Sequence, residues 1–235
     1  MTSHKTLDSP EAYAIAWITA HPIEMVAAEA MLDEEHTAPT GFTRHQTDAN
    51  IYLRPPAVLL NALTSIQSDH ERKCSKVPYF LQEMIEKNPS YAHQGFDNDR
   101  LFKPSCDHVL GPDCRGCDTA DEIQRDRRDT TNPDIHYGTI VSGKTPVKYA
   151  ITHDQIAANL GDDCLCFEME AAGLMNHFPC LVIRGICDYA DSHKNHQWQR
   201  YASATAAAYT KELLAYMPTA EVQETKRALE GLQSG

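Results

Sequence analysis

Four acidic residues stand where they could act together on one ligand. Glu24, Glu168, Glu170 and Asp188 each follow a short apolar run of the kind that forms a buried strand, and Met169 separates the two neighbouring glutamates. Because the carboxyl ends of parallel strands meet at one edge of a sheet, we expect these acids to cluster there. Clustered carboxylates raise one another's pKa and suit a cationic or hydroxyl-rich ligand, and a desolvated acid can donate a proton near neutral pH.

The spacing of Glu168 and Glu170 leaves two interpretations open. If the chain stays extended, both side chains point to the same face with Met169 opposite, whereas a helix would separate them by about 200°. In the alternative interpretation, one of the glutamates caps the helix that follows and Asp188 begins a turn, because acids are common in the first turn of a helix.

A second group of residues has the spacing of a metal site. Its members give the pattern Cys-x-His followed by Cys-x-x-Cys: Cys106, His108, Cys114 and Cys117. Such a set can bind a structural zinc ion in tetrahedral geometry. A chain with eight cysteines can also produce this spacing by chance. The nearby pair His193 and His196 could suggest a further metal site, but we expect both to be polar surface residues.

Alternating strand and helix patterns must position these residues. Apolar runs predict strands at 13–20, 135–142, 164–167 and 180–187. Helical periodicity predicts helices at about 23–32, 57–69, 76–87, 152–160, 170–177 and 197–216. The alternation indicates an α/β fold, with a mainly parallel or mixed central sheet flanked by helices. Residues 88–134 lack sustained periodicity, and a loop of that length is usually functional, held by a metal or disordered.

Composition limits the class of protein. The chain has 235 residues, 42% of them hydrophobic, and a formal net charge of −12. These values predict one globular domain that binds neither nucleic acid nor an anionic membrane surface. Residues 1–11 are polar and resemble no secretory signal, so we expect a cytoplasmic, reducing location in which the cysteines are free thiols or metal ligands.

Several motifs together resemble one known superfamily. They are F-E-M-E-A-A-G (167–173), V-I-R-G-I-C-D-Y-A-D (182–191) and I-H-Y-G-T-I-V-S-G (135–143), with supporting stretches at 20–24 and 192–199. They resemble the nucleoside phosphorylase and nucleosidase superfamily, of the purine and uridine phosphorylase type, and in particular its fungal-type branch at the head of multidomain signalling proteins. The likeness spans about residues 12–218, between polar tails at 1–11 and 219–235.

The resemblance implies a role for each residue on the sugar side of a purine nucleoside. Met169 would pack against the ribose, and Glu170 would accept hydrogen bonds from its 2′ and 3′ hydroxyls. Glu168 would support Glu170. Cleavage of the N-glycosidic bond builds positive charge on the ribose, and carboxylates near the sugar stabilise that charge.

The resemblance also implies roles around the base and the attacking water. Asp188 would protonate or hydrogen-bond N7 of the departing purine, and Glu24 would activate water. Ser142 and Gly143 would approach the base. No cofactor is required for this chemistry, and the family's oligomers imply that the chain forms a homo-oligomer.

The chain departs from the family in one block. After the segment 47–52, members carry several tens of residues with central strands and a glycine-rich turn, whereas here the chain continues directly into L-R-P-P (53–56). Without that turn the usual phosphate cradle is missing, so we expect an incomplete sheet and hydrolysis rather than phosphorolysis. The alternatives are a catalytically impaired module that binds nucleosides or other proteins, and a zinc-stapled interaction domain.

Overall fold

The helices and strands fall into a helical layer and a small sheet. The computed structural model describes residues 5–6, 19–32, 36–37, 55–111, 113–142, 149–160, 164–175, 180–194, 196–220 and 222. Its α-helices are α1 (Pro22–Glu29), α2 (Ala57–Arg72), α3 (Val77–Lys87), α4 (Ala150–Leu160), α5 (Ala171–Met175) and α6 (Gln199–Leu214). Its strands are β1 (Lys5–Thr6), β2 (His36–Thr37), β3 (Thr139–Ser142) and β4 (Cys164–Glu168). No helix in these described ranges is long and apolar enough to cross a membrane.

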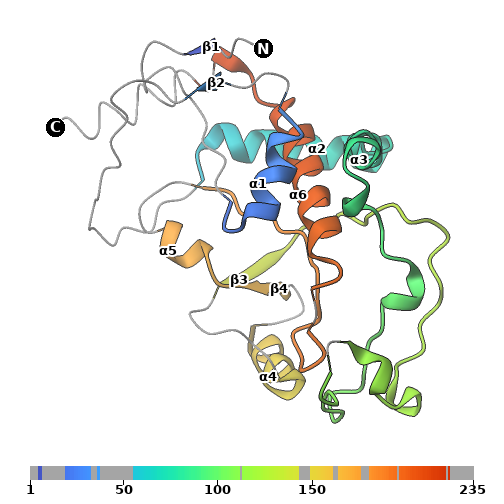
Figure 1. Ribbon diagram of the computed structural model, residues 1–235. Helices are drawn as coiled ribbons and strands as arrows, with labels where there is room; N and C mark the ends of the chain where they lie inside the picture. The colour runs from blue at the N-terminus through green and yellow to red at the C-terminus, as the bar shows by residue number, and fades with distance from the viewer. Residues whose placement is uncertain are drawn as a thin grey trace.

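Helix α6 is the centre of the helical layer and contacts α1, α2 and α3 (Figure 1). Its alanine-rich sequence explains this position, because small side chains let neighbouring helices approach closely. Ala204, Ala207 and Ala208 are buried on α6, and they meet Ile66 of α2 and Met84 of α3 in the main apolar cluster. Burying these side chains is the largest favourable contribution to the stability of the layer.

A buried acid joins α6 to the start of α3. Glu212 is 3% exposed, and its carboxylate accepts hydrogen bonds from the Ser75 hydroxyl at 2.7 Å and from the Lys76 amide at 2.9 Å. The imidazole Nε2 of His70 lies 3.3 Å from the same carboxylate. The carboxylate thus satisfies a backbone amide at the start of α3 that no helical carbonyl can reach.

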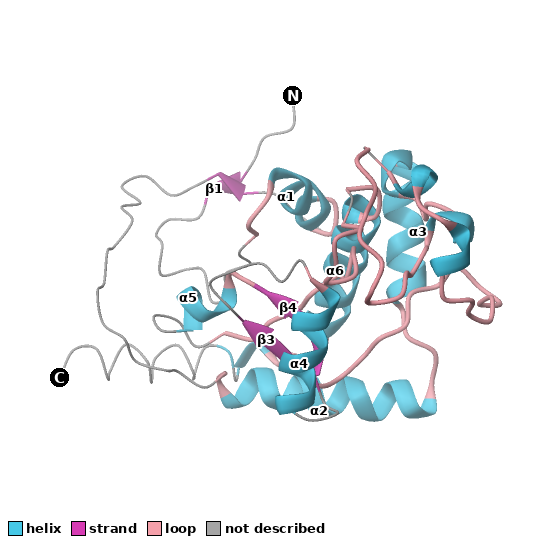
Figure 2. Ribbon diagram, turned by 90° about the horizontal axis from the view of Figure 1, so that it is seen from below, coloured by secondary structure: helices cyan, strands magenta, loops and turns pink. Residues whose placement is uncertain are grey.

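The sheet that bears on function consists of β3 and β4, which pair in parallel (Figure 2). The register places Ser142 opposite Glu168 at the carboxyl ends of the two strands. Helix α4 forms part of the connection between the strands, and α5 begins directly after the bend at Met169 and Glu170. A second, two-residue parallel pair joins β1 to β2 near the N-terminus.

The predicted mixture of helices and parallel strands is confirmed, and the described helices lie within a few residues of their predicted ranges. The predicted strand at 180–187 is wrong, because the described residues of this segment pair with no strand. The segment instead packs directly on the backbone of α6 at Gly185, where a Cβ would collide with the carbonyl oxygen of Ala202. Most of the predicted strand at 13–20 lies outside the described residues.

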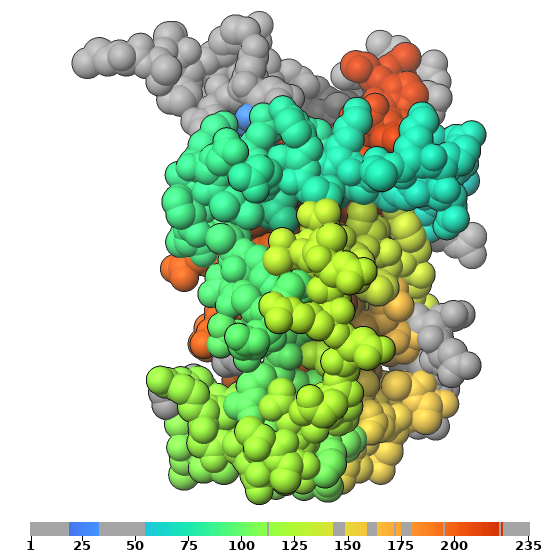
Figure 3. Space-filling model, turned by 90° about the vertical axis from the view of Figure 1, so that its right-hand side faces the viewer, coloured from blue at the N-terminus to red at the C-terminus, as the bar shows by residue number. Residues whose placement is uncertain are grey.

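Residues 88–134 form a structured excursion without long helices. It contains four short 3-10 helices and one bridge between Phe102 and Glu122. Polar contacts hold its turns together; for example, Arg100 pairs with Glu122 at 3.0 Å and donates to the carbonyl of Cys114 at 2.6 Å. Figure 3 shows this excursion, in green to yellow-green, on the face of the molecule below α2 and α3.

Candidate functional site

The carboxyl end of β4 fixes Glu168 in a buried position. Its side chain is held by backbone amides of the following bend, since Oε2 accepts from Glu170 N at 2.7 Å and from Ala171 N at 2.8 Å. Burial acts to raise the pKa of Glu168, but hydrogen bonds from Ser142 and these two amides outweigh burial and hold the pKa below its ordinary value. Glu168 is therefore an anchored carboxylate that caps α5, as the alternative interpretation predicted.

The next two side chains turn toward solvent. Met169, the first residue after β4, is 45% exposed. Glu170 is also exposed, and its Oε2 accepts from the Met169 amide at 3.1 Å and from Arg184 at 3.2 Å. Glu168 and Glu170 thus do not share one face: the first is buried and the second is on the surface. The bend offers an apolar thioether beside an accessible carboxylate.

The two predicted catalytic acids are engaged in local contacts. Glu24 accepts from the amides of Ala20 and His21 at 2.9 and 3.1 Å and so caps α1. Asp188 pairs with Lys194 at 3.0 Å through Oδ1, and its Oδ2 accepts from the Cys187 thiol at 3.4 Å. Within the described residues, no hydrogen bond or ion pair joins either acid to Glu168 or Glu170. Gly143, predicted to approach the base, lies outside the described residues.

A cavity of about 390 Å³ lies beside this bend but does not include the predicted acids. It is lined by Ile140 and Cys166 of the two strands, by Arg184 and by Tyr201 and Tyr209 of α6. Arg184 connects the cavity with the bend, because it lines the cavity and its guanidinium pairs with Glu170. Sequence reasoning missed this arginine, although it occurs in the motif V-I-R-G.

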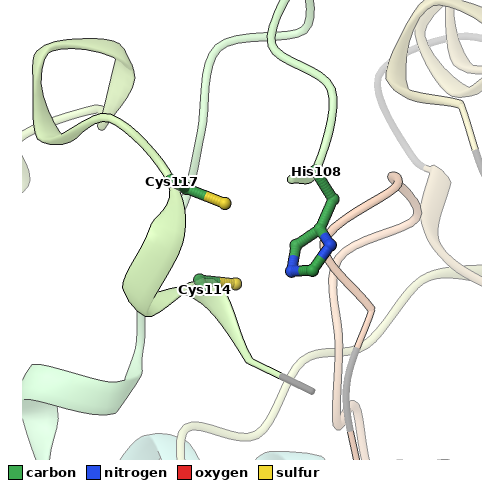
Figure 4. A group of neighbouring side chains, drawn as sticks. All are labelled: His108, Cys114 and Cys117. Atoms are coloured by element: carbon green, nitrogen blue, oxygen red, sulfur yellow. The ribbon is translucent and has the colours of Figure 1, made fainter. Parts of the chain in front are cut away.

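Three of the four predicted metal ligands lie together. His108, Cys114 and Cys117 each offer one ligand atom, and these atoms all lie within 4.8 Å of one another. Figure 4 shows the two thiols, from the turn at 114–117, and the imidazole directed into a common space. Burial raises the pKa of Cys114 to about 11, and the neighbouring Cys117 contributes to the shift. Such thiols need a cation to become thiolates at neutral pH.

Cys106 is set slightly apart and faces a different histidine. Its Sγ lies 3.9 Å from Nε2 of His193. Burial raises the pKa of Cys106, and the charges of Asp121, Cys117 and Asp107 raise it further.

His193 is buried rather than a polar surface residue, so that expectation is wrong, whereas His196 is exposed as predicted. The ring of His193 stacks on Phe102, with a centroid distance of 4.1 Å and an interplanar angle of 10°. Its Nδ1 lies 3.6 Å from Asp191, whose other oxygen accepts from the His193 amide at 2.8 Å. A sequence signal existed, since Asp191 stands two residues before His193 and acids commonly orient histidines in this way.

The chain is similar in sequence to part of a much longer protein. The chain is 40% identical over 165 residues to a protein from Hyaloscypha variabilis named nucleotide-binding leucine-rich repeat (NLR)-like protein. The match covers 68% of this chain but 16% of that protein, so the chain spans about a sixth of the relative's length. No family model matches the chain, and no solved structure matches it.

Proposed function

We propose that the chain binds a purine nucleoside or nucleotide at the carboxyl end of β4 and cleaves its N-glycosidic bond by hydrolysis. The arrangement at the bend carries this proposal: an anchored Glu168, an exposed Met169 and an accessible Glu170 follow one another in the order that the nucleoside phosphorylase and nucleosidase motifs require. An apolar side chain beside a carboxylate suits a ribose, which offers an apolar face and a vicinal diol.

In this proposal Glu170 exchanges its partner when substrate binds. The pair with Arg184 lies at the surface, where an ion pair contributes about 0–1 kcal/mol, so two ribose hydroxyls can replace it at little cost. Met169 then contacts the sugar, and the carboxylate stabilises the positive charge that develops on the ribose. Phosphorolysis is disfavoured because the glycine-rich phosphate cradle of the family is missing from the sequence.

The catalytic step requires two local changes. Asp188 must leave Lys194 to reach N7 of the purine, and Glu24 must release the amides of Ala20 and His21 to activate water. These contacts favour a second candidate function, a module that binds the nucleoside without cleaving it. The relative from Hyaloscypha variabilis is several times longer than the matched region, which fits a domain built into a longer protein under either candidate.

The deciding experiment measures binding and turnover separately. Titration calorimetry with adenosine, inosine and their monophosphates would compare wild type with Glu170→Gln and with Glu86→Gln, an exposed control on α3. We expect Glu170→Gln to weaken binding about 10-fold or more, since hydrogen bonds to a charged group contribute about 1.5–3 kcal/mol each. Glu86→Gln should have no effect.

Release of free base, with and without phosphate, would then compare wild type with Asp188→Asn. Release that needs Asp188 and ignores phosphate supports hydrolysis. Binding without release leaves the binding module as the function. No binding of any of the four ligands by the folded chain contradicts both candidates.

A further inference from the structure

The structure brings together three possible metal ligands, His108, Cys114 and Cys117. Structural zinc sites are almost always four-coordinate, with closed tetrahedral geometry, so a fourth side chain must complete the site. Two side chains of the described residues are near enough to be considered, Cys106 and His193.

His193 reaches the cluster from a distant part of the sequence. Its ring centroid lies 5.4 Å from that of His108, and its carbonyl oxygen lies 3.9 Å from the Sγ of Cys114. The amide of His108 also donates to the Ser192 hydroxyl at 3.0 Å, so the two segments are already in contact. The side chain of His193 therefore lies beside the cluster, next to His108 and Cys114.

The surroundings of His193 are those of a metal-bound histidine. Metal-ligating histidines usually place their second ring nitrogen against a carboxylate, which fixes the ring orientation. Here Nδ1 faces the buried Asp191 at 3.6 Å, and Phe102 holds the ring flat by stacking. Nε2 is therefore the nitrogen left for a metal ion, and it lies on the side of the ring that faces Cys106, at 3.9 Å from its Sγ.

Charge distinguishes His193 from Cys106 as the fourth ligand. Zinc with two thiolates and two neutral imidazoles has no net charge, whereas a third thiolate would leave a charge of −1 on the site. Cys106 is followed directly by Asp107, so an additional negative charge on the site there is unfavourable. Cys106 is also less buried than His193.

We propose that His108, Cys114, Cys117 and His193 form a structural zinc site that ties the excursion at 88–134 to the segment at 188–194. Binding releases one proton from each of the two thiols, and the zinc ion replaces them. The segment at 188–194 begins with Asp188, the proposed acid of the nucleoside site, and ends with its partner Lys194. The zinc ion would therefore also fix the position of Asp188. The zinc site itself does not depend on nucleoside binding.

The first test uses the wild-type chain, purified without added metal and dialysed. Elemental analysis should give about one zinc per chain. In the cobalt-substituted protein we expect the visible absorption of a tetrahedral ion, and a charge-transfer band whose intensity corresponds to two thiolates. No retained zinc, or a band corresponding to three thiolates, would overturn the proposal.

The second test measures zinc affinity of single variants by competition with a chromophoric chelator. We expect Cys117→Ser and His193→Gln to lower the affinity by more than about 100-fold, and Asp191→Asn by about 10–100-fold, the usual cost of losing an outer partner. Cys106→Ser and the exposed control Cys74→Ser should leave it unchanged. Far-ultraviolet circular dichroism checks that each variant keeps its helices. Loss of zinc in Cys106→Ser but not in His193→Gln would assign the fourth position to Cys106 and refute the assignment made here.

Discussion

The helical layer and the excursion at 88–134 are held together in different ways. Around α6, side chains such as Ile66 and Leu213 are at most 2% exposed and pack in one continuous apolar cluster. In the excursion after α3 and Tyr91, the described residues have two buried apolar side chains, Phe102 and Cys117, and ion pairs such as Arg100–Glu122 and Lys103–Asp121 link its turns. The comparison teaches that one half of the molecule is stabilised by burial, whereas the other needs specific cross-links.

Removing the proposed zinc ion should produce the largest difference between the two regions. Zinc binding provides about 10–16 kcal/mol of apparent folding free energy in small zinc domains, so a chelator should unfold the excursion and spare the helices. Trypsin cleaves after arginine, so cleavage at residues 125, 127 and 128 would report the unfolding of the excursion. We expect trypsin to cleave there at least 10-fold faster after chelation, while α2 and α6 stay intact. Equal cleavage rates with and without chelator would contradict the comparison.

Ile66→Ala should destabilise the helical layer and leave the zinc affinity unchanged. Ile66 is fully buried between the helices, and truncating such a side chain costs about 2–5 kcal/mol of unfolding free energy. Urea unfolding followed by circular dichroism measures the loss, and Leu60→Ala on the exposed side of α2 is the control. Zinc affinity at low urea should not change. A parallel loss of zinc affinity would mean that the two regions are not independent.

Glu212→Ala should have a smaller effect on the same helical layer. The change leaves the Lys76 amide and the Ser75 hydroxyl without their buried acceptor, which costs about 1–3 kcal/mol. Urea unfolding would compare it with Glu83→Ala, because the Glu83 carboxylate is exposed and accepts a hydrogen bond from the Tyr79 hydroxyl at the surface. Equal stabilities of the two variants would show that the cap at α3 contributes nothing.

Glu168 should give the smallest effect, and one that depends on pH. Because its pKa is lower in the folded chain, ionised Glu168 stabilises the fold above its unfolded pKa of about 4.3, and this contribution disappears as pH falls through the folded pKa. We expect the free energy of unfolding of wild type to exceed that of Glu168→Gln by about 1 kcal/mol at pH 7 and by much less near pH 3. If the difference in unfolding free energy grew toward low pH, the pKa of Glu168 would be raised by folding and not lowered, which would contradict the prediction.

The sequence predicted the helices well because their periodicity is local. Alanine-rich α6 and amphipathic α3 begin and end within two residues of the predicted ranges. The run at 180–187 has the composition of a strand but no partner strand in the described chain, and a strand exists only where a neighbour supplies its hydrogen bonds. Composition cannot reveal that partner.

Candidate site residues that are close in sequence could be grouped before the structure was known, whereas those brought together by the fold could not. The cysteines at 114 and 117 share one turn with a spacing typical of zinc ligands, so their grouping with His108 was visible in the sequence. The contact of His193 with His108 of that group spans more than eighty residues, and only the folded chain displays it. The pairing of Arg184 with Glu170 likewise depends on where the segment at 180–187 packs.

The cavity of about 390 Å³ lined by the two strands and α6 also bears on how the molecule responds to pressure. It opens to solvent, so water fills it in the native chain. Only internal voids that exclude water make the native chain larger in volume than the unfolded chain. The cavity therefore adds little to the volume change of unfolding, and hydrostatic pressure should not single out the region around it.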